Sequence, residues 1–450
     1  NAIYGQLDEN LQIDDSISNV LLPYRVADRK LMTGAISSVE TEDLSRKNDL
    51  NLLSALKGLA SGLYISENPS PNRKSNYDLA IRGLNSTSIA NSVPLIIVDG
   101  IQRPIEYVQA VEVESVTILK DPVSKSFYRG KAVNGVIFIT TKRGKLNKDS
   151  RNIQVETGIS YSHKLPNFLD SYEYVNYYNL ARRNSGLSDL YTQDEIEAYK
   201  NPSIRYPSND YQSLLLNNNL KFIRTNVSFT GGSEKLKYFL GGSYIHHGGL
   251  EGVGNSNSLN QFNVRANLDY TVTSNIDAFL DIYGFTDNNR SNFMRGDDLF
   301  RRMSIQRPNE YAILLKDHQN QDSIKYGAGR LSTIGNYQNL YAEMLKGGFR
   351  ENTERVGQMS MGFKLNLNPL LEGLNAKVTF SFDTYNFTSI GKNDDFYSYI
   401  PTAWDGDVLL KDSLVTAGRK NSDMSTLGSE GYRQYSILGQ LNYNRYFGYH

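Results

Sequence analysis

The chain has 450 residues with a formal net charge of +0, and it contains 31 tyrosines and 18 phenylalanines but no cysteine. The balanced charge argues against a nucleic-acid partner, and the lack of cysteine excludes disulfides, thiolate metal ligands and cysteine nucleophiles. No apolar run approaches the roughly 18–20 residues of a membrane-spanning helix, so we expect either a soluble protein or a β-barrel, whose strands alternate apolar and polar residues.

The first 150 residues have the pattern of a compact α/β unit. The stretch "NDLNLLSALKGLASGL" has leucines at helical spacing, with Asn48 or Asp49 as the expected N-cap and Gly62 as the expected stop. Short strands are predicted to begin near Leu63, Asp78, Pro94, Ser115 and Val136. Several of these strands are apolar on both faces, so their sheet must be covered on both sides.

The last of these strands lies in "YRGKAVNGVIFITTKRGK". Its apolar run, Val136 to Ile139, ends in threonines and then in the cations Lys142, Arg143 and Lys145. The strand is fully buried, and a cluster of cations and then a long stretch with a different residue pattern follow it. This order indicates a small domain inside a larger structure.

Beyond Arg151 the pattern changes to strict alternation, as in "NVRANLDYTV" and "IDAFLDIYGF". In the first of these segments one face is apolar (Val264, Ala266, Leu268, Tyr270, Val272) and the other polar (Asn263, Arg265, Asn267, Asp269, Thr271). A soluble β-sandwich also alternates. Strands of about ten residues, aromatic strand ends, and tight turns alternating with long polar loops favour an outer-membrane barrel.

Several segments, in order along the chain, resemble the plug and first barrel strands of SusC/RagA-type TonB-dependent outer-membrane transporters. The resemblance implies an N-terminal plug inside a barrel of about 22 strands, energised by TonB and commonly capped by a surface lipoprotein. The segments are "MTGAISSVETEDL", "LLSALKGLASGLYIS", "LAIRGLNS", "PLIIVDGI", "VESVTILKDPVSKSFYRGKAVNGVIFITTKRGK", "YPSNDYQSLL" and "NVSFTGGSEKLKYFLGGSY".

We therefore expect a β fold: a membrane β-barrel with an N-terminal α/β plug domain in its lumen. The expected divisions are a coupling segment at 1–30, the plug at 31–150, and the first part of the transmembrane barrel, with long extracellular loops, at 151–450. This part is roughly the first half of the barrel, on the order of ten strands. Because the pattern is unfinished at the last residue, we expect a longer protein. The chain opens without a signal peptide, which indicates cytoplasmic residence or a processed start.

Matching the family's TonB box position by position gives a coupling strand near the N-terminus. An extended apolar segment of this kind can be captured by pairing with the edge of a partner's sheet. The family reads valines and a Gly-Tyr-Gly where this chain has "NVLLPYRV", so the limits of the box are open, and an ordinary edge strand of the plug is the alternative. The box residues are Asn19, Val20, Leu21, Leu22, Pro23 and Tyr24.

Three cations of the plug, Arg82, Arg129 and Lys131, are candidates for a latch between plug and barrel. A buried charge must be paired. We expect carboxylates on the lumen face of the barrel to pair with them; a local salt bridge within the plug is the alternative. The candidate carboxylates are Asp269, Asp281 and Asp383, together with carboxylates in the expected remainder of the barrel.

A polar, uncharged loop between two plug strands is a candidate for contact with an uncharged polyol cargo, although ordinary turns have the same composition. Its candidate residues are Asn85, Ser86, Thr87, Ser88 and Asn91. We expect no catalytic site, no cofactor and no metal. In particular, His246 and His247 are adjacent on a predicted strand and point to opposite faces, so they cannot share an ion.

The favoured function is TonB-dependent import of glycan oligosaccharides across the bacterial outer membrane. The expected partners are TonB with ExbB and ExbD, a SusD-like surface lipoprotein, outer-membrane lipid and the cargo, and no nucleic acid. A peptide importer of the same family is the nearest alternative. A plugged surface receptor and a glycan-degrading surface enzyme, which would need two carboxylates at catalytic separation, are alternatives from other classes.

Overall fold

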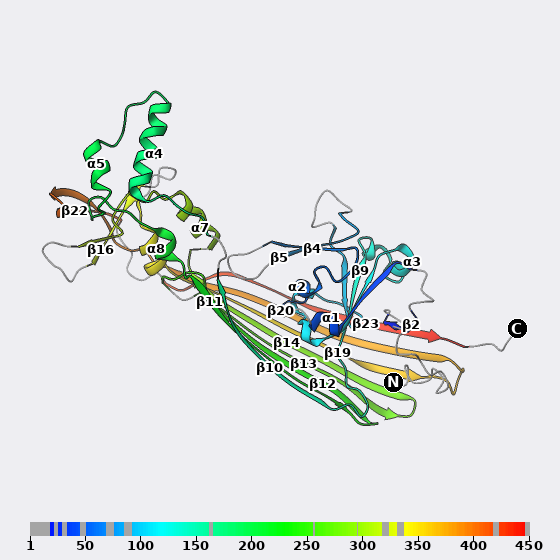
Figure 1. Cartoon of the computed structure of the whole chain (residues 1–450). Coiled ribbons are helices and arrows are strands. Elements are labelled where there is room, and N and C mark those ends of the chain that lie inside the picture. The colour runs from blue at the N-terminus through cyan, green and yellow to red at the C-terminus, as the bar shows by residue number, and fades with distance from the viewer. Residues whose placement is uncertain are drawn as a thin grey trace.

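A computed structural model describes residues 19–21, 26–28, 34–45, 51–68, 76–84, 92–161, 165–254, 257–294, 296–316, 324–330, 337–416 and 423–445. It contains a small α/β unit, which we call the plug, and a sheet of long antiparallel strands, which we call the wall. The plug lies against one face of the wall (Figure 1). No helix in the described ranges is long and apolar enough to cross a membrane.

The plug is built around a mixed sheet. Its strands lie in the order β3 (Ile36–Glu40), β8 (Val113–Leu119), β9 (Val136–Thr141), β6 (Leu95–Val98) and β7 (Ile101–Gln102). Only the β6–β9 pair is parallel. Two hairpins accompany the sheet: β4 (Leu63–Asn68) with β5 (Asn76–Ile81), and β1 (Asn19–Leu21) with β2 (Val26–Asp28).

The central strands of the plug are buried on both faces, as the sequence predicts. Val116, Ile118, Ile137 and Ile139 are each 0% exposed. They pack with α1 (Thr41–Ser45) and α2 (Leu52–Leu56) in the main core of the plug. The irregular segments η3 (Ile105–Tyr107), η4 (Ala110–Glu112), α3 (Pro122–Lys125) and η5 (Ser126–Ala132) complete the unit.

The helix predicted before the first plug strands is shorter than its apolar pattern indicates. Its N-cap is Asn51, whose side chain accepts a hydrogen bond from the Leu53 amide at 2.7 Å, so the predicted caps Asn48 and Asp49, which lie outside the described residues, are wrong. The helix ends before Gly62 because Gly58 already has a positive φ of 75°, a conformation that glycine adopts without strain.

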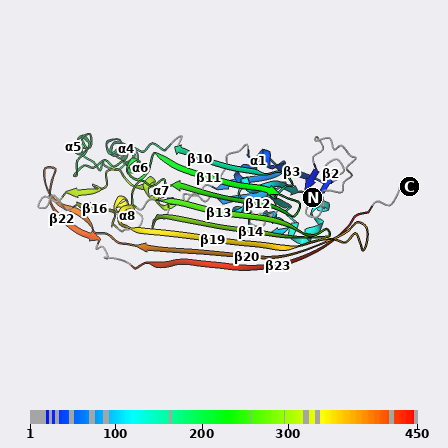
Figure 2. The same ribbon diagram turned by 90° about the horizontal axis from the view of Figure 1, so that it is seen from below.

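The wall consists of eight strands that pair in chain order, each antiparallel to the next (Figure 2). They are β10 (Ser150–Tyr161), β11 (Asn219–Gly232), β12 (Leu236–Gly248), β13 (Ser258–Thr273), β14 (Ile276–Asn292), β19 (Gly348–Asn366), β20 (Leu374–Asn393) and β23 (Ser425–Tyr443). These strands have 12 to 20 residues, so the expected length of about ten residues is too short, whereas the eight wall strands of the described ranges agree with an expected number on the order of ten.

The alternation along the wall has the predicted orientation. On β13, Asn263, Arg265 and Asn267 face the plug and are at most 3% exposed, whereas Val264 and Tyr270 on the other face are 43% and 49% exposed. Because side chains alternate along a strand, the apolar residues form the outer surface of the wall and the polar residues line the surface that holds the plug.

Short turns connect the wall strands at one rim, and long connections gather at the other (Figure 1). The connections fold into α4 (Ser171–Asn184), α5 (Gln193–Ala198), α6 (Tyr211–Leu215), α7 (Gly296–Ile305) and α8 (Leu340–Lys346). They also form a sheet of β15 (Leu314–Lys316), β16 (Ile324–Gly327), β21 (Ser398–Asp405) and β22 (Val408–Thr416), and the pair β17 (Gly329–Arg330) and β18 (Tyr337–Gln338). The strands β21 and β22 join this outer sheet rather than the wall.

Candidate functional site

The plug is attached to the wall by buried polar contacts, of which the first is made by Arg103, directly after β7. Its Nε donates to Asp383 Oδ2 at 2.9 Å and its Nη2 to Asp383 Oδ1 at 2.7 Å and to Ser360 Oγ at 2.9 Å. The side chains of Arg103 and Asp383 are 3% and 7% exposed. This is the bidentate geometry in which a guanidinium binds a carboxylate most strongly.

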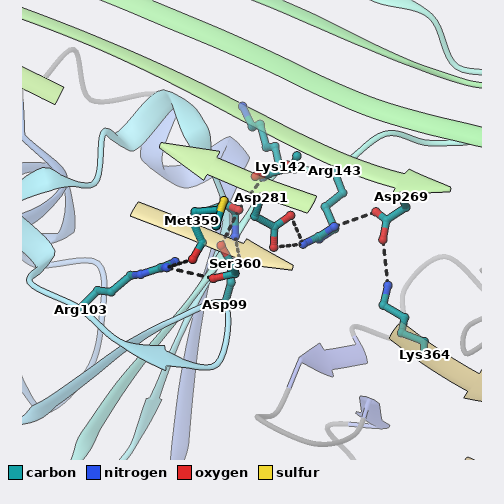
Figure 3. Close-up of polar contacts among 11 residues, drawn as sticks. Asp99, Arg103, Lys142, Arg143, Asp269, Asp281, Met359, Ser360 and Lys364 are labelled. Atoms are coloured by element: carbon teal, nitrogen blue, oxygen red, sulfur yellow. Dashed lines mark hydrogen bonds and ion pairs between the residues drawn. The ribbon is translucent and has the colours of Figure 1, made fainter. Parts of the chain in front are cut away.

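The second contact is made by Arg143, two residues after the end of β9 (Figure 3). Its Nη1 donates to Asp269 Oδ2 at 2.8 Å, and its Nη2 donates to both carboxylate oxygens of Asp281 at 2.6 Å. Asp269 also accepts from Lys364 Nζ at 2.9 Å. Burial alone would lower the pKa of Arg143, but the two aspartates outweigh it and raise that pKa, so the guanidinium stays charged.

The third contact is made by Glu112 at the end of η4. Its Oε2 accepts from Arg265 Nε at 2.8 Å, and its Oε1 accepts from Asn263 Nδ2. The side chains of Glu112 and Arg265 are each 2% exposed, and the Arg265 guanidinium lies 4.5 Å from the centre of the Tyr283 ring. Here the plug supplies the carboxylate and the wall supplies the cation.

The fourth contact is made by Tyr107 in η3. Its hydroxyl donates to Glu354 Oε1 at 2.6 Å, and its carbonyl accepts from the Tyr283 hydroxyl. Its ring packs on Phe285 and Tyr385, with centroids 5.3 and 6.4 Å apart. Burial and the neighbouring Glu354 raise the pKa of Tyr107, so its hydroxyl keeps the proton that it donates.

We call these four plug residues, Arg103, Tyr107, Glu112 and Arg143, together with their partners on the wall, the clamp. All the wall partners lie on β13, β14, β19 and β20. A buried ion pair contributes little net stability compared with an apolar pair, but removing one partner costs about 3–5 kcal/mol. The clamp therefore fixes the orientation of the plug, and it is sensitive to the loss of any one charge.

The structure gives the predicted carboxylates other partners. Asp269 and Asp281 pair with Arg143, and Asp383 pairs with Arg103, so the pairing of these carboxylates with the predicted cations is wrong. Arg82 follows β5 with a φ of 61° and is exposed, as is Lys131, and no ion pair found in the described ranges includes either of them. The side chain of Arg129 lies outside the described residues. A latch that uses these three cations stays a prediction.

The predicted coupling strand is described only in part. Asn19 to Leu21 form β1, whose residues pair with Asp28, Ala27 and Val26 of β2. The remaining box residues, Leu22, Pro23 and Tyr24, lie outside the described residues. The same holds for the whole predicted cargo loop, Asn85, Ser86, Thr87, Ser88 and Asn91. Both assignments stay predictions.

Comparisons with known proteins agree with this architecture. Residues 28–136 match the family model described as TonB-dependent Receptor Plug Domain. TonB-dependent receptor P26 of Formosa agariphila is 27% identical over 279 residues, which are 60% of this chain and 27% of the relative. TonB-dependent receptor SusC of Bacteroides thetaiotaomicron is 29% identical over 208 residues, which are 42% of this chain and 20% of SusC.

Among solved structures, the RagAB peptide importer in its open-open state matches 86% of this chain and 44% of that chain, with a TM-score of 0.64 and 19% identity. The closed-closed state matches with a TM-score of 0.63. The matched part spans about a quarter of the length of the curated relatives and less than half of the RagAB chain.

Residues 28–136 are therefore a plug domain of the TonB-dependent receptor type, and the curated relatives are TonB-dependent receptors. More narrowly, the chain is similar to SusC/RagA-type TonB-dependent transporters, in agreement with the resemblance found in the sequence. The wall is accordingly the first part of a transmembrane β-barrel, and the clamp joins the plug to its lumen face.

Proposed function

We propose that the protein imports a nutrient across the outer membrane in a TonB-dependent manner. The observation that carries the proposal is a folded plug that is held on the lumen face of a barrel wall, with a separate strand pair ahead of it in the chain. Such a plug closes the lumen at rest. Import therefore needs a force that rearranges the plug, and the N-terminal segment is the part that periplasmic TonB, energised by ExbB and ExbD, can reach.

The strand β1 supports this coupling role. In a two-stranded sheet each strand keeps one unpaired edge, so β1 can accept a strand of TonB while it is still paired with β2. Affinity would come from main-chain hydrogen bonds, which explains how a segment that departs from the family's valines and glycines could still be bound.

A SusD-like surface lipoprotein is the proposed extracellular partner. Exposed apolar side chains gather on and directly after α4: Tyr177, Leu180, Leu187 and Leu190 are 59%, 46%, 53% and 51% exposed. Apolar groups concentrated at one place on a surface are typical of a protein interface. The patch lies at the rim of the long connections, where a lid would sit.

For the cargo we propose glycan oligosaccharides. The described ranges of the long connections contain a row of tyrosines that continues from Tyr174 through Tyr178 and Tyr191 to Tyr199, with neighbouring ring centroids 5.8 to 6.2 Å apart. Tyr199 is buried and Tyr174 and Tyr191 are partly buried in the small core beside α4 and α5, so their exposed parts are what a cargo could contact. Tyrosine suits sugar rings, and it suits peptides as well. Peptides are the second candidate, because RagAB is described as a peptide importer. The relatives are described as TonB-dependent receptors and as a peptide importer, which supports uptake or reception over the surface-enzyme alternative.

The test is deletion of residues 19–24 from the full-length protein. Cells would be given either a labelled oligosaccharide mixture or a labelled peptide mixture, and uptake and surface capture would be measured separately. We expect the deletion to abolish uptake while the amount of folded protein in the outer membrane and surface capture stay normal. Uptake at the wild-type rate would contradict energised import. Uptake of peptides alone by the wild type would replace the oligosaccharide assignment.

A further inference from the structure

A cavity of about 140 Å³ lies between the plug and the wall strands β10, β11 and β12. On the wall side it is lined by amide and hydroxyl side chains, among them Gln154, Asn226 and Ser228. On the plug side it is lined in part by Thr41 and Leu44 of α1. The first wall strands thus face the plug across a polar space, whereas β13, β14, β19 and β20 face it through the clamp.

The charged side chains that line this cavity are two carboxylates, Glu112 and Glu156, and two cations, Lys142 and Arg224, so their charges balance. Glu156 of β10 pairs with Arg224 of β11 at 3.3 Å, and Glu112 is held by Arg265. Amides, hydroxyls and paired charges can hydrogen-bond a solute without a net field that would attract or repel an ion. The lining therefore suits an uncharged, hydrogen-bonding cargo.

The plug elements at the cavity are also the ones that a pull on the N-terminus reaches early. Along the chain, β1 and β2 are followed by β3 and then directly by α1. Within the described ranges, β3 lies at the edge of the plug sheet and has one strand neighbour, β8. Besides this ladder, the Ser37 hydroxyl makes hydrogen bonds with Ser61 and Lys120. The clamp residues, Arg103 to Arg143, come later in the chain and are fixed to the wall.

We propose that the cargo passes the plug between α1 and wall strands β10–β12, along this cavity. TonB withdraws β1, β2, β3 and α1, which removes Thr41 and Leu44 from the cavity, while the clamp keeps the remainder of the plug on β13, β14, β19 and β20. This assignment rests on the proposed function, because it needs a pull on the N-terminal segment.

The first test compares the accessibility of two single cysteines, Asn226→Cys and Ser381→Cys, in the full-length protein. Both native side chains are buried, at 7% and 0% exposure, and both face the plug, but Asn226 lies at the cavity and Ser381 on clamped β20. The chain has no cysteine of its own to react. The probe is a small maleimide, applied to cells with and without TonB that are supplied with mixed oligosaccharides and peptides.

We expect N226C to react at least tenfold faster with TonB than without it, and S381C to react equally slowly in both. TonB-dependent labelling of S381C would overturn the path. Equal labelling of N226C with and without TonB, in cells whose uptake requires TonB, would also overturn it. Loss of TonB dependence in the uptake itself would instead contradict the proposed function, and the deletion of residues 19–24 tests that separately.

The second test locks β3 to β8 with a disulfide. Ser38→Cys with Thr117→Cys joins directly opposite residues of these strands, and Ser115→Cys with Thr140→Cys joins β8 to β9 as the matched control. Oxidation of the first pair should block uptake and reduction should restore it, whereas the control pair should transport in both states. Normal uptake by the oxidised S38C/T117C protein would overturn the withdrawal of β3. If that pair does not fold, the cysteine accessibility test decides alone.

Discussion

Replacing Arg103 with alanine should loosen the plug more than replacing an exposed residue of the plug. The change removes the guanidinium that holds Asp383 and Ser360, and it leaves the Asp383 carboxylate buried at 7% exposure with its partner gone. Breaking a buried pair in this way costs about 3–5 kcal/mol. Since each 1.4 kcal/mol is a factor of ten, the ratio of seated to released plug should fall by roughly a hundredfold or more.

The assay is the conductance of the full-length protein in a planar bilayer, titrated with urea. R103A should conduct at a lower urea concentration than the wild type, because a less stable plug is released sooner. The matched variant replaces both partners, Arg103→Leu with Asp383→Leu, and should recover most of the loss since no charge is left unpaired. If R103A and the double variant behaved alike, or if Arg82→Ala loosened the plug as much as R103A, the clamp would be refuted in favour of the predicted latch.

Three further predictions concern the wall, the segment between β9 and β10, and the pH dependence of plug stability. Val264→Arg, near the middle of β13, should impair assembly by about 2–4 kcal/mol, whereas Val272→Arg, near the rim, should cost about 0–1 kcal/mol. Equal yields of folded protein for the two variants would refute the placement of Val264 at mid-depth in the membrane. Gly144→Ala should cost about 1–3 kcal/mol because a Cβ there would overlap the backbone of β11 and β12, while Gly130→Ala meets no atom within 4 Å and should be neutral in a urea titration. Burial alone would raise the pKa of Asp121, but backbone and side-chain hydrogen bonds from the start of α3 outweigh it and lower the pKa. Plug stability should therefore fall as the pH drops below about 3.9, and Asp121→Asn should weaken that dependence in a urea titration.

The regular parts of the molecule were predictable from the sequence because a repeating pattern determines them. Alternation along β13 gave the two faces of the wall, and the unbroken apolar run of β9 gave a strand buried on both sides. Each of these patterns depends on a physical period or on burial, and not on which distant residue is nearby.

The clamp was not predictable in the same way. Alternation places Asp269, Asp281 and Asp383 on the lumen face, but it does not show which cations reach them, and the structure pairs them with Arg143 and Arg103. Arg143 belongs to the group of cations that follows β9. Its place two residues after a buried strand is the signal that could identify it as a lumen contact.

Arg103, Tyr107 and Glu112 carried no such signal, since they lie in short irregular segments whose course depends on tertiary packing. The helices of the long connections were missed for a different reason. A capping box of Asp170 and Glu173 begins α4 and is a signal in the sequence, but alternation, the pattern used for residues 151–450, does not detect a helix.

If TonB pulls on the N-terminal strand, it must bind that strand, so binding to purified TonB is the decisive measurement. The full-length protein, with residues 19–24 present or deleted, would be titrated with the periplasmic domain of TonB in detergent. We predict saturable binding by the intact protein, little change on Leu21→Ala because main-chain pairing dominates, and no binding after the deletion. Equal binding by the intact and the deleted protein would contradict the account.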